Sequence, residues 1–103
     1  MVKNLDMTTK KSSQTSWKIK ISKQAKEDLS WFRKHNKDLY SKCFDLTLAI
    51  SEDPFEGIGK PEHLKGLKGN VWSRRVNLEH RLVYEVFVGN LIVIASYRYH
   101  YPD

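Results

Sequence analysis

The second half of the chain carries arginines, a glutamate, a histidine and tyrosines in a set that suits phosphodiester chemistry. RNA cleavage needs a base for the 2′-OH proton, an acid for the leaving 5′-oxygen, and positive charge where the phosphate gains negative charge. Glutamate and histidine can transfer these protons, and the planar fork of arginine pairs with two phosphate oxygens. Neighbouring aromatic rings could stack on the bases of single-stranded RNA. The residues in question are Glu62, Arg74, Arg75, Arg81, Arg98, His100 and Tyr101.

Each of these residues also has an ordinary structural explanation. Trp72-Ser73-Arg74-Arg75 could be a solvated edge strand, and a loop glutamate such as Glu62 is most often just exposed. His63 and His80 are expected to be surface histidines. Cys43 lies on an apolar helix stripe, which predicts a buried small residue rather than a nucleophile. The cysteine and histidines show no ligand spacing, so neither a metal site nor a cofactor is expected.

Apolar spacing predicts the elements that would position these groups. Residues 17–21 alternate apolar and polar side chains, as in a strand with one buried face. A helix is expected to begin after Ser22, and a second helix to end before Pro54, because a residue that precedes proline disfavours the helical conformation. The first apolar stripe is Ala25, Leu29 and Phe32; the second is Leu39, Cys43, Leu46 and Ile50, widened by Tyr40, Phe44 and Leu48.

Three more strands are expected after a long loop. Residues 54–69 are broken by proline and glycine, whereas 71–77, 81–88 and 91–101 have strand character. A turn at 77–80 and a hairpin turn at Gly89-Asn90 would join them. The order β-α-α-β-β-β predicts an α+β fold, in which an antiparallel twisted sheet carries the N-terminal helix pair on one face. This connectivity would bring the arginines and the C-terminal histidine together near one end of the sheet.

Composition limits the partners and the compartment. The 103 residues make one domain, with residues 1–16 expected to be a flexible polar arm and residues 17–103 to fold. A net charge of +6 favours a polyanionic partner. A single cysteine excludes an intrachain disulfide and fits a reducing compartment. There is no signal-peptide core in residues 1–16, and the longest apolar run, 91–95, is too short to span a bilayer, so a cytoplasmic protein without membrane contact is expected.

Four motifs, in order and at compatible spacing over about residues 17–103, resemble those of the YoeB/Txe toxins of the RelE superfamily. They are Pro54-Phe55-Glu56-Gly57-Ile58-Gly59-Lys60-Pro61-Glu62-His63-Leu64-Lys65, Trp72-Ser73-Arg74-Arg75, Glu79-His80-Arg81-Leu82-Val83-Tyr84 and Tyr97-Arg98-Tyr99-His100-Tyr101. The resemblance implies a RelE-like fold and a metal-independent endoribonuclease that cleaves mRNA in the ribosomal A site. It also implies inhibition by a YefM-like antitoxin, contact with operator DNA only through the antitoxin complex, and a homodimer as a further assembly.

The resemblance implies a role for each matching residue. Glu62 resembles the general base of the family, and His100 resembles its general acid. Arg81 resembles the arginine that contacts the scissile phosphate, and Tyr101 the tyrosine that helps to place the substrate. The implied cleavage is attack by the 2′-OH, which gives a 2′,3′-cyclic phosphate and a new 5′-OH. Lys65 and Arg75 match accessory basic positions of the family, and Arg74 and Arg98 join them as candidates for substrate binding because the connectivity places them near the same end of the sheet.

The C-terminus departs from the family pattern and raises a geometric question. The family usually ends at the His-Tyr pair, whereas Pro102 and Asp103 follow it here, and the polar arm is also additional. In a regular strand His100 and Tyr101 would point to opposite faces. Both can serve one site only if the strand ends or twists near Tyr99, and this is expected.

Two other functions stay open on the residues alone. A non-enzymatic toxin of the same fold class would act on DNA gyrase, and the presence of Glu62, Arg81 and His100 argues against it. A basic RNA-binding module would bind in a salt-sensitive way without turnover.

Overall fold

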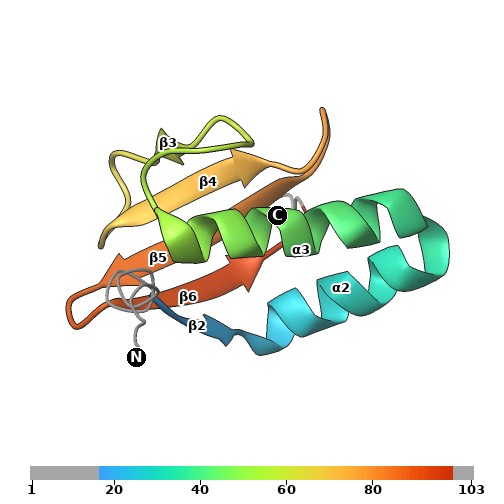
Figure 1. The fold of residues 1–103 in the computed structure, drawn as a ribbon, viewed down its shortest axis with the longest axis horizontal. Helices are drawn as coiled ribbons and strands as arrows, with labels where there is room; N and C mark the ends of the chain where they lie inside the picture. The colour runs from blue at the N-terminus through green and yellow to red at the C-terminus, as the bar shows by residue number, and fades with distance from the viewer. Residues whose placement is uncertain (1–16, 99–103) are drawn as a thin grey trace, which may run out of the picture.

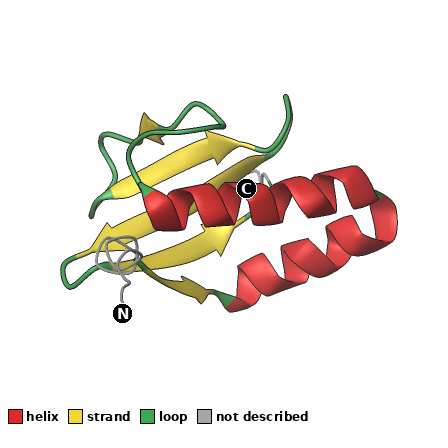
Figure 2. Ribbon diagram, in the orientation of Figure 1, coloured by secondary structure: helices red, strands yellow, loops and turns green. Residues whose placement is uncertain are grey.

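The computed structural model describes residues 17–98, in which two helices cover one face of a five-stranded sheet (Figures 1 and 2). The elements in chain order are β2 (Lys18–Ile21), α2 (Lys23–His35), α3 (Lys37–Glu52), β3 (Glu62–His63), β4 (Val71–Arg75), β5 (Arg81–Phe87) and β6 (Leu91–Ser96). The predicted α+β class is confirmed, with one strand more than expected. Residues 1–16 and 99–103, and with them the proposed polar arm, His100 and Tyr101, lie outside the described residues.

The sequence predicts a wholly antiparallel sheet, and this prediction is wrong. The sheet is mixed. Its order is β2-β6-β5-β4-β3, and β2 pairs with β6 in parallel, from Lys18 opposite Leu91 to Ile21 opposite Ile94. The other neighbours pair antiparallel. Alternation along a strand shows which side chains are buried but not which way a neighbour runs, so the direction of this edge strand could not be obtained from the pattern.

The helices begin and end where the capping residues predict. The Ser22 hydroxyl accepts the Ala25 N–H (3.0 Å), and the Asn36 side chain accepts the Leu39 N–H (3.1 Å). These contacts satisfy amide groups that have no partner within the helix. Helix α3 ends at Glu52, two residues before Pro54.

A single apolar core lies between the helices and the sheet. It contains the predicted helix residues and the alternate residues of β5 and β6: Ala25, Phe32, Cys43, Leu46, Ile50, Val76, Leu82, Tyr84, Val86, Ile92, Ile94 and Tyr97. Phe44 and Leu48 are 48% and 62% exposed, so the prediction that they widen the buried stripe is wrong. Burial, and then the negative charge of Asp28, raises the pKa of Cys43 to about 12, which keeps the thiol protonated and unreactive at neutral pH.

Arg74 is part of this core, although the sequence predicts it to bind substrate. Its side chain is fully buried, on the face of β4 that meets the helices. One terminal nitrogen, Nη2, donates to the carbonyls of Asp53 (2.6 Å) and Glu56 (3.0 Å), and Nη1 donates to that of Ile58 (3.1 Å). Its Nε donates to the Tyr84 hydroxyl (3.2 Å). Arg74 therefore fastens the loop after α3 and is not available to a ligand on the other face.

Replacing Arg74 should destabilise the fold far more than replacing its neighbour. In Arg74→Lys a point charge replaces the planar guanidinium, and several partly buried hydrogen bonds to loop carbonyls are lost. We expect the free energy of unfolding to fall by about 2–4 kcal/mol in denaturant titrations. The exposed Arg75→Lys, next along the strand, is the matched control and should change it by less than about 0.5 kcal/mol. Equal effects of the two substitutions would contradict this role of Arg74.

The buried hydroxyl of Tyr97 and the buried thiol of Cys43 should make the stability of the fold sensitive to high pH. Burial raises the pKa of Tyr97 from 10.0 to about 12, opposed by a hydrogen bond with Thr47, and the Cys43 pKa rises from 9.0. Above pH 9 the unfolded chain loses these protons first, so the stability present below pH 9 is lost as the pH rises towards 12. The free energy of unfolding, measured from pH 8 to 11, should fall less steeply in Tyr97→Phe than in the parent. An unchanged slope would exclude Tyr97 as a cause.

Candidate active site

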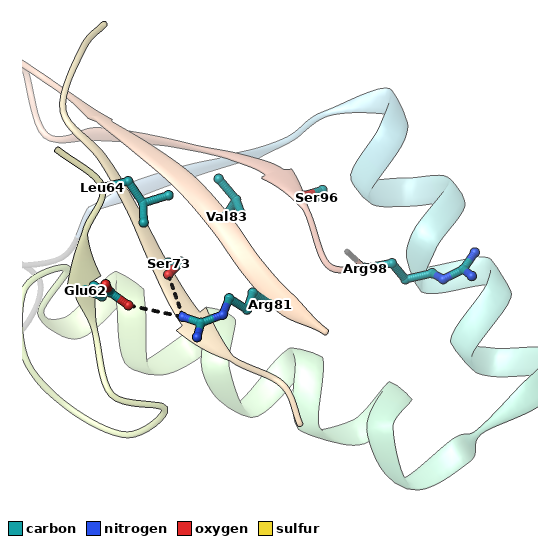
Figure 3. Close-up of a pocket in the computed structure, with 7 residues that line it drawn as sticks. All are labelled: Glu62, Leu64, Ser73, Arg81, Val83, Ser96 and Arg98. Atoms are coloured by element: carbon teal, nitrogen blue, oxygen red, sulfur yellow. Dashed lines mark hydrogen bonds and ion pairs between the residues drawn. The ribbon is translucent and has the colours of Figure 1, made fainter. Parts of the chain in front are cut away.

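An open groove of about 430 Å³ lies on the face of the sheet opposite the helices (Figure 3). Strands β3 to β6 and the residues that follow β3 and β6 contribute its side chains. The lining residues are Glu62, Leu64, Ser73, Arg81, Val83, Ser96 and Arg98. Three of the predicted site residues therefore meet in one groove, although the chain separates them by up to 36 positions (98 minus 62).

The centre of the groove is an ion pair between Glu62 and Arg81. Strand β4 lies between β3 and β5, with Glu62 opposite Ser73 and Ser73 opposite Val83, so all three side chains point to the same face. Arg81 reaches back across β4, and its Nη1 lies 3.2 Å from Glu62 Oε1 and 3.4 Å from Ser73 Oγ (Figure 3). The side chains of Arg81 and Glu62 are 38% and 62% exposed, so both can reach a ligand.

The short strand β3 holds Glu62 in this position. The sequence predicts an unstructured loop over residues 54–69, whereas Glu62 and His63 pair with Ser73 and Trp72 of β4. Two paired residues are too few to show a strand period, so the pattern gave no signal. The His63 ring stacks on Trp72, with ring centroids 5.0 Å apart, and this contact lies on the other face of the strand from Glu62.

Ser73 is a site residue that the sequence analysis did not single out. It is fully buried under Arg81, and its hydroxyl is within hydrogen-bonding reach of the guanidinium. Leu64 and Val83 add an apolar lining beside it. A serine or an aliphatic residue in a strand carries no chemical signal by itself, so only the cross-strand register could have found these residues.

The other basic candidates lie at different distances from this centre. Arg75 is exposed and lies opposite Arg81 in the antiparallel register, so two arginines share one edge of the open face. Lys65 is exposed in the loop after β3 and is not among the lining residues. Arg98 lines the groove at the end of the described chain. The arrangement is a carboxylate beside fixed positive charge, open to solvent.

The chain leaves β6 before it reaches the C-terminal motif. β6 ends at Ser96, ahead of Tyr99, and Tyr97 is buried in the core, as predicted for it. The backbone N–H groups of Tyr97 and Arg98 both donate to Asp28 Oδ2 on α2, at 2.9 and 3.1 Å. The direction of the chain at Tyr97 and Arg98 is therefore set by helix α2 rather than by the sheet.

The prediction that His80 is a surface histidine is wrong, because its side chain is buried. It closes the turn before β5, where the Asn77 side chain accepts the N–H groups of Glu79 (2.9 Å) and His80 (2.6 Å). This turn directs the ring against Phe32, 5.3 Å away between ring centroids. His63 is exposed, as expected.

Residues 17–98 contain neither a metal-binding cluster nor a membrane-spanning helix. No three or more His, Cys, Asp or Glu side chains in that range gather in a way that could hold a metal ion. None of the helices there is long and apolar enough to cross a membrane.

Residues 21–101 match the family described as the YoeB-like toxin of bacterial type II toxin–antitoxin systems. The toxin YoeB of Synechocystis is 45% identical over 84 residues, which are 82% of this chain and 96% of that protein. The family match takes in all four motifs that carry the candidate site, including the C-terminal one, whose last three residues lie outside the described part of the chain.

Solved structures give the same assignment from the fold. A YoeB dimer from Staphylococcus aureus superposes with a TM-score of 0.72 at 46% identity, over 84% of this chain and 99% of that one. A heterotetrameric YoeB–YefM toxin–antitoxin complex from the same organism gives 0.72 at 45% identity, over 82% and 98%. The RelE-like fold that the motifs predict is thereby confirmed, and the chain belongs to the family of YoeB-like toxins of bacterial type II toxin–antitoxin systems.

Proposed function

We propose that this toxin is a ribosome-dependent endonuclease that cleaves mRNA by attack of a 2′-OH on the adjacent phosphate. The observation that carries the proposal is the exposed contact between Glu62 and Arg81 in the groove, 3.2 Å apart. A carboxylate that can take a proton lies there beside a guanidinium that can bind a phosphate. These are the two groups that the first half of the reaction needs.

Glu62 acts in this proposal as the general base. It removes the proton of the 2′-OH, the 2′-oxygen bonds to phosphorus, and the negative charge moves onto the non-bridging oxygens. Arg81 binds these oxygens, and it is free to do so because an exposed ion pair contributes about 0–1 kcal/mol and is readily exchanged for a phosphate. When the phosphate takes Arg81, Glu62 is left free to accept the proton. Ser73 limits the rotation of Arg81 from below, since its hydroxyl lies 3.4 Å from Nη1.

The second half of the reaction is assigned to the C-terminal motif. His100 protonates the 5′-oxygen as its bond to phosphorus breaks, which leaves a 2′,3′-cyclic phosphate and a 5′-OH. Tyr101 helps to place the substrate. Lys65, Arg75 and Arg98 bind the neighbouring backbone, while Arg74 is left out because it is buried on the other face. The mechanism needs no metal ion or cofactor, since a side chain is assigned to each proton transfer and to the charge on the phosphate.

The proposed partners follow from the openness and the charge of the site. A shallow groove holds a flexible single strand poorly, so the A site of the ribosome would supply the orientation of the mRNA, which is a large part of the barrier. A YefM-like antitoxin would cover the basic groove, and related toxins occur both in a YoeB–YefM complex and as a YoeB dimer. We propose the same two assemblies here, with contact to operator DNA only through the antitoxin.

Removing the general base should slow cleavage strongly without unfolding the protein. Glu62→Gln keeps the shape of the side chain but cannot accept the proton, and we expect a 10²–10⁴-fold slower cleavage of ribosome-bound mRNA by primer extension. His100→Ala should have an effect of similar size. Glu27→Gln, which removes an exposed carboxylate from helix α2, is the matched control and should cleave at the parent rate. Cleavage by Glu62→Gln at the parent rate would refute the assignment, as would inhibition of gyrase supercoiling by a protein that leaves mRNA intact.

Cleavage should depend on a single hydroxyl of the substrate. An mRNA with a 2′-deoxy nucleotide at the cut should bind but stay intact, because the nucleophile is missing. The parent mRNA should give a fragment that ends in a 2′,3′-cyclic phosphate, detected by mass spectrometry. A cut 2′-deoxy substrate, or a 5′-phosphate on the downstream fragment, would point to attack by water instead.

A further inference from the structure

Arg98, which the proposed reaction assigns to the neighbouring backbone, has contacts that orient its side chain. Its stem lines the groove, and its guanidinium turns away from Glu62 towards helix α2 (Figure 3). There the guanidinium carbon lies 3.7 Å from the ring centroid of Trp31. Such a stacked contact holds the plane of the guanidinium without using any of its N–H donors.

Trp31 is held in place as a platform for this contact. The His35 ring stacks on it at 4.3 Å between centroids, and His35 Nδ1 lies 2.8 Å from the Trp31 carbonyl. The rings of Phe32 and His80 meet Trp31 edge-on, at 5.5 and 6.2 Å. An indole with neighbours on this many sides has little freedom to rotate, so the position of Arg98 is fixed as well.

The backbone of Arg98 is fixed by the same helix. Its N–H donates to Asp28 Oδ2 at 3.1 Å, and Asp28 is 1% exposed. Asp28 lies three positions before Trp31 on α2, so both contacts come from neighbouring turns of one rigid element. Main chain and side chain of Arg98 are thus oriented before any ligand binds.

Within the described part of the chain, no hydrogen bond or ion pair uses the donors of this oriented guanidinium. Among residues 17–98 the buried Nε of Arg98 has no hydrogen-bond partner, and its side chain takes part in no ion pair. Arg74, by contrast, makes four hydrogen bonds through the same type of side chain. Arg98 as a whole is only partly buried, so a ligand that brings acceptors can reach its side chain.

We propose that Trp31 and Arg98 form a second phosphate subsite, which binds the backbone of the nucleotide next to the one that is cut. This inference rests on the proposed function, because it uses the same RNA strand as it leaves the groove. A phosphate fits better than a base, since Trp31 already occupies one face of the guanidinium while no residue of 17–98 accepts from the donors along its edge. Arg98 is the binding residue, and Trp31 is a positioning residue that acts through it.

The subsite can be tested by removing the same positive charge at two arginines, one inside the proposed subsite and one outside it. Arg98→Gln removes the proposed contact, and Arg33→Gln removes the same charge from an exposed position of α2. In cleavage of ribosome-bound mRNA we expect Arg98→Gln to raise KM about ten- to a hundredfold with kcat nearly unchanged. Arg33→Gln should keep the parent KM and kcat. The same KM for both variants would overturn the proposal.

A binding measurement separates this subsite from the cleavage reaction. The probe is a single-stranded RNA with a 2′-deoxy nucleotide at the cut, titrated at several salt concentrations. Loss of one phosphate contact lowers the slope of log affinity against log salt by about 0.7 for a single strand. Arg98→Gln should show this drop and Arg33→Gln should not. If the parent protein fails to cleave mRNA but the drop appears, the proposed function is wrong and the subsite stands; if the parent cleaves and no drop appears, the subsite alone is wrong.

Conservative rescue tests the positioning role of Trp31. Trp31→Leu removes the ring and should reproduce the KM increase and the smaller salt slope of Arg98→Gln, whereas Trp31→Phe keeps a ring under the guanidinium and should restore both towards the parent values. Thermal unfolding identifies loss of the fold. If Trp31→Leu does not fold, Trp31→Phe decides, because a salt slope equal to that of Arg98→Gln in this folded variant would contradict the role of the ring.

Discussion

The buried guanidinium of Arg74 is the contact on which the position of the site depends. It binds the carbonyls of Asp53, Glu56 and Ile58, so it holds the loop that carries the chain from α3 to β3. The loop passes so close that a Cβ on Gly57 would lie 2.9 Å from Arg74 Nη1, and the φ of +130° there also disfavours a side chain. Beyond this loop the chain pairs with β4 and places Glu62 in the groove. A side chain on the core face of the sheet therefore positions a reactive group on the other face.

The pleat of β4 divides the structural and the chemical tasks between its two faces. Arg74 points into the core, and Ser73 and Arg75 point to the open face, because successive side chains of a strand alternate. The helices cover only the core face (Figure 1). The reactive pair of the groove, Glu62 and Arg81, can consequently be exposed and weakly paired, since the packing that stabilises the fold lies on the other face.

Periodicity and capping were enough to predict the helices, the last three strands and the α+β class, because burial on one face leaves a repeat in the sequence. They were not enough where a feature depends on pairing between distant segments. The parallel direction of β2, the two-residue strand β3, and the choice of Arg74 rather than Arg75 as the buried arginine all follow from register. His80 was misjudged for a related reason, since its burial comes from the turn that Asn77 closes. Glu62, Arg81 and Arg98 could be named from the motifs, whereas Ser73 and Trp31 could be recognised only from their contacts.

Three arginines of one chain show how environment decides what the same side chain can do. Arg74 is buried with four hydrogen bonds. A ligand could bind it only if the loop carbonyls lost their hydrogen-bond donor. Arg81 holds an exposed carboxylate at 3.2 Å, a contact weak enough for a phosphate to replace. Arg98 is held by an aromatic ring, so its geometry is set while no described residue accepts from its donors. From Arg74 to Arg81 to Arg98, the guanidinium makes fewer hydrogen bonds within the described chain and is more available to a ligand. A guanidinium without such hydrogen bonds keeps its orientation only if other contacts hold it. At Arg98 these contacts are the Trp31 ring and the bond of the main chain to Asp28.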